Sequence, residues 1–422
     1  MTQIEINSDR IAEEIEILAG ISEVEPPAVT RVVFSEQDIR ARTWLKKRYE
    51  EVDLSIREDA VGNTFARWQG SRSDLPAVAT GSHIDAIPNA GKYDGVVGVL
   101  GGLEAIRALK RNGFQPIRSI ELIQFTSEEP TRFGIGCLGS RMLSGALTAS
   151  ADELLRDKAG DTLRIIRTRA GFAGESESVR LSEGFYSSFV ELHIEQGPIL
   201  ELEQLSIGIV TNIAAPASFF VSVEGQGGHA GGVLMAERHD ALCAAAELIL
   251  TAERLARESG AIDTVATVGI CEVHPGAINS IPSSVKLGVD LRDVDGDRRD
   301  RVLQAFLNAA KEISQRRQIK LQTEMLNADR PAVSSPHILD VIASACKEDN
   351  FSFRQIMARA YHDSLFMSRI APMAMIFIPC RDGVSHRPDE YASIEDITRG
   401  VRVLAKSLAT LSLDVSSDTV ST

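Results

Sequence analysis

The order of strand-like and helix-like segments changes in the middle of this 422-residue chain. In the first and last parts, short apolar runs alternate with segments whose apolar residues recur every three or four positions. Such alternation is typical of an α/β fold with a largely parallel or mixed sheet. In the middle the order becomes strand, helix, strand, strand, helix, strand, which is the split βαβ pattern of ferredoxin-like α+β domains. The sequence therefore predicts one α/β domain, 1–213 and 328–422, interrupted by an inserted α+β domain, 214–327.

The period of the apolar side chains places the individual elements. In the α/β parts we expect strands at 77–80, 119–126, 189–195 and 374–378, and helices at 94–113, 139–145, 336–348 and 394–411. In the inserted part we expect strands at 217–224, 264–273, 285–294 and 320–326, and helices at 237–259 and 297–316. The glycines from Gly95 to Gly102 lack the G-x-G-x-x-G spacing of a nucleotide-binding loop, so they indicate a closely packed helix.

Charge and composition exclude several classes of protein. The chain has 59 acidic against 45 basic residues, and a net charge of −14 disfavours binding to nucleic acid or to an anionic membrane. No apolar run approaches the roughly 20 residues that cross a bilayer. The first ten residues are polar and acidic, unlike the apolar core of a secretory signal. The five scattered cysteines indicate reduced thiols, so we expect a cytoplasmic enzyme without nucleic-acid or membrane partners.

Histidines and acidic residues recur where the predicted strands end. The candidates are His83, Asp85, Asp94, Glu128, Glu129, His193 and His386. Adjacent carboxylates after an apolar strand repel each other and are costly to bury unless a cation or solvent offsets them. Mixed imidazole and carboxylate donors suit zinc, manganese or cobalt better than magnesium or calcium. Taken singly, Asp94 also fits a helix N-cap and the glutamate pair also fits a solvated loop, so the residues leave both explanations open.

Five strings of the sequence together resemble the M20-type amidohydrolases. They are Gly81–Pro88, Gly91–Gly95, Thr126–Pro130, His193–Pro198 and Gly227–Gly231, and the resemblance extends from about Ile11 to Leu413. The family includes N-carbamoyl-L-amino acid hydrolases, allantoate amidohydrolases and ureidoglycolate amidohydrolases. The resemblance implies a mixed-sheet catalytic domain with a dinuclear metal site, and an inserted domain that serves as a lid and forms a homodimer.

The same resemblance implies a role for each candidate residue. One divalent metal ion would be held by His83, Asp94 and His193, and a second by Asp94, Glu129 and His386, with Asp94 bridging. Glu128 would be the general base, and the Asp85 carboxylate would fix the tautomer of His83. The expected metal is Mn²⁺, with Zn²⁺, Co²⁺ or Ni²⁺ as alternatives. The implied substrate contacts are Gln196, His229, Asn279, Arg292, Tyr361 and His362, of which His229 would also polarise the scissile carbonyl.

Within this family, Glu129–Arg141 and Ala360–Met367 look most like ureidoglycolate amidohydrolase. The expected reaction is cleavage of the ureido C–N bond of (S)-ureidoglycolate, in purine or allantoin degradation, to glyoxylate, ammonia and carbon dioxide. The close alternatives are an N-carbamoyl-L-amino acid hydrolase and an allantoate amidohydrolase. A dinuclear peptidase is disfavoured because that branch usually has a carboxylate where His193 stands. A non-catalytic scaffold is disfavoured because Glu128, which is not an implied ligand, would have no structural purpose.

Overall fold

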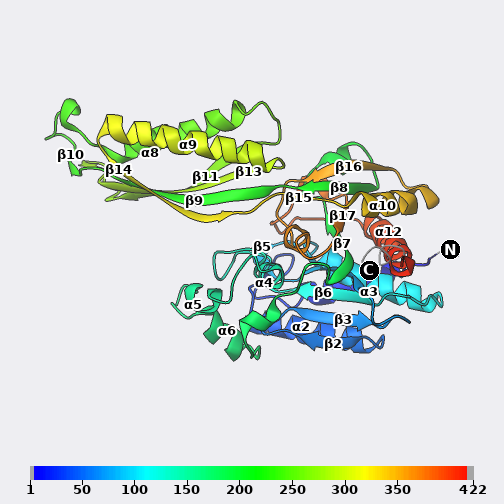
Figure 1. Ribbon diagram of the computed structural model, residues 1–422. Helices are drawn as coiled ribbons and strands as arrows, with labels where there is room; N and C mark the ends of the chain where they lie inside the picture. The colour runs from blue at the N-terminus through cyan, green and yellow to red at the C-terminus, as the bar shows by residue number, and fades with distance from the viewer. Residues whose placement is uncertain (1–3, 416–422) are drawn as a thin grey trace, which may run out of the picture. The chain divides into compact units, whose positions relative to one another are not determined.

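The computed structural model describes residues 4–415, which form two compact units (Figure 1). The first unit runs to Thr211 and resumes over Val333–Ala358 and from His362 onward. The second unit comprises Asn212–Ala332 together with Arg359–Tyr361. No sequence pattern predicts that Arg359–Tyr361 belongs to the second unit. It belongs to the second unit because Arg359 pairs with Asp263 and the Tyr361 hydroxyl donates to Asp329.

A nine-stranded mixed sheet lies in the first unit of the described chain. Its strand order is β15-β8-β17-β7-β4-β6-β3-β2, with β16 paired to β8. The bounds are β2 Ser55–Glu58, β3 Thr64–Trp68, β4 Ala77–His83, β6 Ile120–Phe125, β7 Tyr186–Ile194, β8 Ile207–Ile213, β15 Ala332–Val333, β16 Phe353–Ala358 and β17 Met373–Ile378. The central strands β17, β7, β4 and β6 run parallel, whereas β8, β3 and β2 pair antiparallel. The predicted mixed-sheet α/β class is therefore confirmed.

The central strands are buried on both faces, which explains their apolar composition. The helices of this unit are α1 Ser8–Ala19, α2 Glu36–Glu50, α3 Val96–Arg111, α4 Leu138–Ser144, α5 Ala151–Leu154, α6 Leu163–Arg169, α7 Ile199–Leu202, α10 Pro336–Glu348, α11 Ser364–Met367 and α12 Ile394–Leu413. The unit also contains a small sheet of β1 Val29–Arg31 and β5 Ala86–Ala90, and the 3₁₀ turns η1 Ser176–Val179 and η3 Arg381–Gly383.

Helix α3 approaches the central sheet closely through its glycines. A Cβ atom at Gly98 would lie 2.5 Å from both the Leu192 carbonyl oxygen and the Ser82 Cβ. A Cβ atom at Gly102 would lie 2.7 Å from the Leu122 side chain. The prediction that this glycine-rich stretch is a closely packed helix is confirmed. This packing presents the N-terminus of α3 to the ends of β4 and β7.

The second unit contains a four-stranded antiparallel sheet in the order β11-β13-β9-β14. Its strands are β9 Ala215–Glu224, β11 Val265–His274, β13 Ser284–Asp293 and β14 Lys320–Ala328. Helices α8 Ala241–Arg257 and α9 Gly296–Arg317 pack on one face through a shared apolar core (Figure 1). A short ladder of β10 Gly228–His229 and β12 Ser280–Ile281 and the turn η2 Met235–Glu237 complete the unit. The order of the six main elements is the predicted one.

Among residues 4–415 there is no helix whose length and hydropathy would let it span a bilayer.

Candidate metal centre

The predicted ligands of the first unit come from the carboxyl ends of its parallel strands. His83 ends β4, His193 lies near the end of β7, and Glu129 follows β6. His386 lies in the loop after β17, and Asp94 lies just before α3. Side chains at these positions meet because neighbouring parallel strands end at the same edge of a sheet. The structure brings these five residues together.

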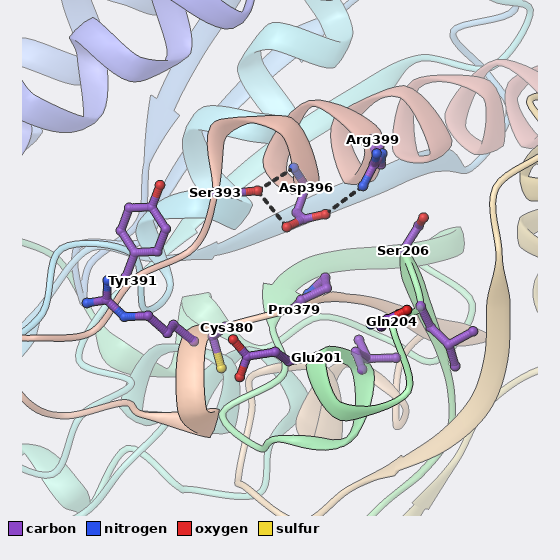
Figure 2. A pocket seen from close by; sticks show the side chains of 12 residues that line it. Glu201, Gln204, Ser206, Pro379, Cys380, Tyr391, Ser393, Asp396 and Arg399 are labelled. Carbon is purple, nitrogen blue, oxygen red and sulfur yellow. Dashed lines mark hydrogen bonds and ion pairs between the residues drawn. The ribbon is translucent and has the colours of Figure 1, made fainter.

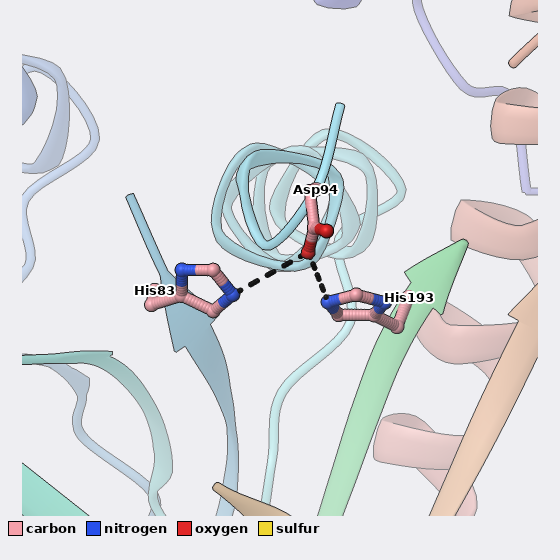
Figure 3. Close-up of side chains that lie close together, drawn as sticks. All are labelled: His83, Asp94 and His193. Carbon is pink, nitrogen blue, oxygen red and sulfur yellow. Dashed lines mark ion pairs between the residues drawn. The ribbon is translucent and has the colours of Figure 1, made fainter. Parts of the chain in front are cut away.

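The first group consists of His83, Asp94 and His193, whose ligand atoms lie within 4.8 Å of one another. Figure 3 shows the Asp94 carboxylate between the two imidazole rings, which come from β4 and β7. The Asp94 Oδ1 atom lies 3.6 Å from His83 Nε2 and 3.1 Å from His193 Nε2. All three residues are buried, so water does not solvate them freely.

The second group consists of Asp94, Glu129 and His386, again with ligand atoms within 4.8 Å of one another. His386 Nε2 lies 3.3 Å from Asp94 Oδ2 and 3.0 Å from Glu129 Oε1. Asp94 therefore turns one carboxylate oxygen toward each group. This is the arrangement in which one carboxylate can bridge two cations.

The protonation of two imidazoles fits metal ligation. His83 Nδ1 lies 3.1 Å from the Asp85 carbonyl oxygen, and His193 Nδ1 lies 2.9 Å from that of Ile194. A carbonyl oxygen only accepts, so we assign the proton to Nδ1 in both rings. The other ring nitrogen, Nε2, faces the Asp94 carboxylate, and it can bind a cation once it has lost its proton. Metal-binding histidines commonly donate the other ring N–H to a carbonyl in this way, so the donor set fits a divalent cation.

Mutual hydrogen bonding among these groups shifts their pKa values in the metal-free protein. Burial alone would raise the pKa of Asp94, but hydrogen bonds from His193, His386 and His83 lower it well below its usual range. Hydrogen bonds with Asp94 and Glu129 raise the pKa of His386 to about 11. Without a metal ion, protons on the imidazoles neutralise the cluster. A cation that binds must therefore displace those protons, so we expect binding to weaken at low pH.

A helix N-cap at Asp94 and a solvated loop at Glu128 and Glu129 are both inconsistent with the structure. The N-cap residue of α3 is Gly95, without a side-chain hydrogen bond at the cap, so Asp94 is not the N-cap. Glu128 and Glu129 are 8% and 3% exposed, so they do not form a solvated loop. Burial, only partly offset by the charge on His83, raises the pKa of Glu128 well above its usual range.

Asp85 holds the glutamate pair in place. Its carboxylate accepts hydrogen bonds from the backbone N–H groups of Glu128, at 3.2 Å, and Glu129, at 3.0 Å. The same carboxylate lies 3.7 Å from His83 Nδ1, whereas the Asp85 carbonyl oxygen lies nearer to that nitrogen. The backbone of Asp85 thus orients the imidazole, and its side chain orients the loop that follows β6.

Two of the residues predicted to contact substrate lie beside the first group. The Gln196 side-chain amide donates to Asp94 Oδ2 at 2.7 Å. The His362 ring is buried, with its centroid 4.6 Å from that of His193. Burial, reinforced by the neighbouring His193, lowers the pKa of His362 well below its usual value, so this imidazole is neutral.

The other predicted substrate contacts belong to the second unit. His229 and Asn279 are neighbours there, since the Ala230 N–H donates to the Asn279 carbonyl and β10 pairs with β12. Arg292 lies on β13, where its Nε donates to Asp290 Oδ1 at 2.7 Å. The Tyr361 hydroxyl donates to Asp329 at 2.7 Å.

Sequence reasoning missed three residues that contact the cluster. The Ser385 hydroxyl lies 2.5 Å from Asp94 Oδ2, and Glu390 accepts hydrogen bonds from the loops on either side of the cluster. The Cys137 thiol donates to Glu128 Oε1 at 3.5 Å. The polar string from Ser385 to Glu390 around the candidate ligand His386 was the available signal for the first two.

A separate hollow of about 340 Å³ lies beside the segment that leads to His386 (Figure 2). Its lining includes Glu201 of α7, Cys380, Tyr391 and Asp396, and none of the predicted site residues lines it. Its charged groups are already engaged: Glu201 accepts from the Asp382 N–H, and Asp396 pairs with Arg399. We therefore place the candidate active site at the cluster of candidate metal ligands.

The chain belongs to peptidase family M20/M25/M40, whose family model matches residues 79–410. It is 54% identical to the ureidoglycolate hydrolase of Oryza sativa subsp. japonica, over 97% of this chain and 85% of that protein. The crystal structure of AtUAH in complex with glyoxylate has 51% identity and a TM-score of 0.91, and the match covers 98% of this chain and 99% of that one. An N-carbamoyl-L-amino-acid amidohydrolase of Pseudomonas sp. (strain NS671) is 35% identical over 97% of this chain and 99% of that protein. The predicted family is confirmed.

Proposed function

We propose that this chain is a metal-dependent hydrolase that cleaves the ureido C–N bond of (S)-ureidoglycolate. Once the resulting α-hydroxy amine has also lost its nitrogen, the products are glyoxylate, two molecules of ammonia and carbon dioxide. The observation that carries the proposal is the pair of ligand groups that share the buried Asp94. The choice of substrate rests on the nearly full-length similarity to a ureidoglycolate hydrolase, which is much higher than the similarity to a carbamoylase.

The proposed metal centre has two sites. His83, Asp94 and His193 would hold one divalent cation, and Asp94, Glu129 and His386 would hold the other. Imidazole and carboxylate donors accept several first-row metals, and we propose Mn²⁺ as the ion in use, with Zn²⁺, Co²⁺ or Ni²⁺ as substitutes. Cations in these sites lower the pKa of water and polarise a carbonyl oxygen.

Glu128 is the proposed general base. Its Oε2 lies 3.7 Å from His83 Nε2, beside the first group, and it is not a member of either ligand group. Burial raises the pKa of Glu128, which makes its carboxylate a stronger proton acceptor. Glu128 takes the proton from the attacking water and delivers it to the departing ureido nitrogen. Asp85 keeps Glu128 in place through the backbone N–H of that residue.

The remaining proposed contacts recognise the substrate. Arg292 is the candidate partner for the substrate carboxylate, because a guanidinium can bind a carboxylate through two parallel hydrogen bonds. His229 would polarise the scissile carbonyl, with Asn279 beside it as a further polar contact, and Tyr361 would be another polar contact from the second unit. Gln196 and His362 would contact the substrate from the first unit. We propose that the second unit closes as a lid over the substrate.

We also propose a cytoplasmic homodimer formed through the second unit. All five cysteines are free thiols, which suits a reducing compartment. The proposed dimer rests on the exposed edge of the β11 strand, which could pair with a second copy.

An assay with a panel of substrates tests the choice of substrate. Enzyme reconstituted with Mn²⁺ would be given (S)-ureidoglycolate, allantoate and N-carbamoyl-L-amino acids, and ammonia release would be followed. We expect kcat/KM for ureidoglycolate to exceed that of the others by at least about tenfold, since a polar pocket rejects ligands that leave its groups unpaired. Equal or better turnover of an N-carbamoyl amino acid or of allantoate would favour that alternative.

A further inference from the structure

We propose that Glu390 is a positioning residue, which joins the loop of Asp94 to the loop of His386 and thereby sets the metal affinity of the cluster. The inference rests on the proposed metal-dependent function and concerns how the protein maintains the site. Glu390 follows His386 by four positions, is 4% exposed, and is not itself a member of either ligand group.

The two carboxylate oxygens of Glu390 serve different loops. Oε1 accepts from the backbone N–H groups of Tyr93, at 2.8 Å, and Asp94, at 3.1 Å. Oε2 accepts from the backbone N–H of His386, at 3.3 Å, and lies 2.9 Å from the Ser385 hydroxyl, whose single proton is shared between Glu390 and Asp94. One side chain thus contacts the backbone of the shared ligand and the backbone of a ligand of the second group, although these lie nearly 300 residues apart in the sequence.

The surrounding backbone is shaped to admit this side chain. A Cβ atom at Gly91 would lie 2.3 Å from the Cβ of Glu390 and 2.4 Å from its Oε1, so only glycine permits the approach. The Ser385 hydroxyl lies between Glu390 Oε2 and Asp94 Oδ2, at 2.9 and 2.5 Å. Ser385 therefore connects the positioning carboxylate directly to the shared ligand.

Comparison with another buried carboxylate shows why Glu390 is singled out. Glu191 is fully buried as well and lies close to His193 and His362, but its oxygens accept from Ser82 and Ser364, neither of which is a candidate ligand. Glu390 instead contacts the N–H groups of two candidate ligands. Because its partners are all hydrogen-bond donors, replacing one of its oxygens by a donor group should break its contact with one of the two loops.

The substitution Glu390→Gln tests the inference in the full chain. Glutamine can still accept from Tyr93 and Asp94, but its NH₂ group would face the His386 N–H, so the hydrogen bond from that backbone N–H is lost. We expect the Mn²⁺ dissociation constants, measured by competition with a chelator, to rise about 10- to 100-fold, the usual effect of changing a residue that orients a ligand. We also expect excess Mn²⁺ to restore turnover, which would not follow if the substitution merely reduced the amount of folded protein.

Asp389→Asn is the matched control, because it removes one charge from an exposed position of the same loop. Its Mn²⁺ affinity should equal that of the wild type. If Glu390→Gln does not fold, Ser385→Ala is the variant to use, because it removes only one of the four donors. It should also raise the Mn²⁺ dissociation constants. Wild-type Mn²⁺ affinity in folded Glu390→Gln, or in Ser385→Ala if that variant must be used, would overturn the inference. A wild-type chain that binds Mn²⁺ but does not hydrolyse ureidoglycolate would contradict the proposed function alone, since affinities can still be compared.

Discussion

Asp94 is the residue on which both ligand groups depend. Its two oxygens face different imidazoles, and further hydrogen bonds from Gln196 and Ser385 fix its orientation. Burial of this carboxylate costs free energy unless positive charge offsets it, as the protonated imidazoles do in the metal-free protein. The buried cluster therefore needs positive charge, which either protons on the imidazoles or bound metal ions can supply.

The substitution Glu128→Gln should separate catalysis from metal binding. It preserves the size of the side chain but removes its ability to accept a proton, so we expect kcat to fall about 10²- to 10⁴-fold. Bound metal should stay at the wild-type level because Glu128 is not a candidate ligand. Steady-state kinetics together with elemental analysis measure both quantities. The exposed Glu203→Gln serves as the control, and wild-type turnover in Glu128→Gln would exclude this residue as the base.

The substitution Arg292→Lys should affect substrate binding. Lysine keeps the charge but cannot bind a carboxylate through two parallel hydrogen bonds, so we expect KM for ureidoglycolate to rise about tenfold or more with metal content unchanged. Arg301→Lys, at an exposed position on α9 of the same unit, is the control. If KM is unchanged, the substrate carboxylate is recognised by another group.

At the scale of elements, the central strands and their helices were predictable because their patterns are local. Helix α10 begins and ends where the sequence places it, and α3, β9 and β17 differ by only a few residues. The alternation over 189–195 predicted β7, but not that its polar face would be buried too. That burial depends on partners distant in the sequence, such as Ser82 and Ser364, which satisfy Glu191.

Asp363, at the start of helix α11, makes the stability of the fold depend on pH. Asp363 is buried there; its Oδ1 accepts from Ser140, and its Oδ2 has no hydrogen-bond partner among residues 4–415. Burial, reinforced by the charge of Glu191, raises the pKa of Asp363 from 3.8 to about 8. The folded protein therefore binds this proton more tightly than the unfolded chain does. The resulting stability is fully present below about pH 4 and is lost as the pH rises to about 8.

The substitution Asp363→Asn removes this titration. We expect the melting temperature of the variant, relative to that of the wild type, to rise progressively from pH 5 to pH 8 and then to level off, by about 2 °C or more in total. Scanning calorimetry of the metal-free proteins across this range measures it. A difference in melting temperature that does not change with pH would show that Asp363 does not titrate in this interval.

At the scale of the whole molecule, the sequence predicted the fold class and the family, whereas several contacts depend on tertiary structure. Four of the five candidate ligands, His83, Asp94, Glu129 and His193, stand in strings that match the family, and His386 could be proposed because it follows a predicted strand. Glu390 could not, because Arg387, Pro388 and Asp389 before it give the string the composition of an exposed loop. The roles of His229 and Arg292 toward substrate remain predictions.

The exposed edge of the second unit makes dimerisation testable. In the described part of the chain, β11 is the first strand in its sheet order, is ten residues long, and has Val265 and Ile270 more than 40% exposed. A long unprotected edge favours pairing with another strand. Light scattering at micromolar concentration should give about twice the 45.8 kDa mass of one chain. Ile270→Lys should shift the mass toward one chain, and Ile262→Lys outside the strand should not; a monomeric wild type would exclude the dimer.

The most direct test of the central claim is the metal content of Asp94→Ala. Because Asp94 offers one oxygen to each ligand group, its removal should deprive both sites of a ligand at once. Elemental analysis after reconstitution with Mn²⁺ should find two ions per wild-type chain and nearly none in Asp94→Ala, with near-native circular dichroism in both. Two ions per chain in folded Asp94→Ala would contradict a dinuclear centre built around this residue.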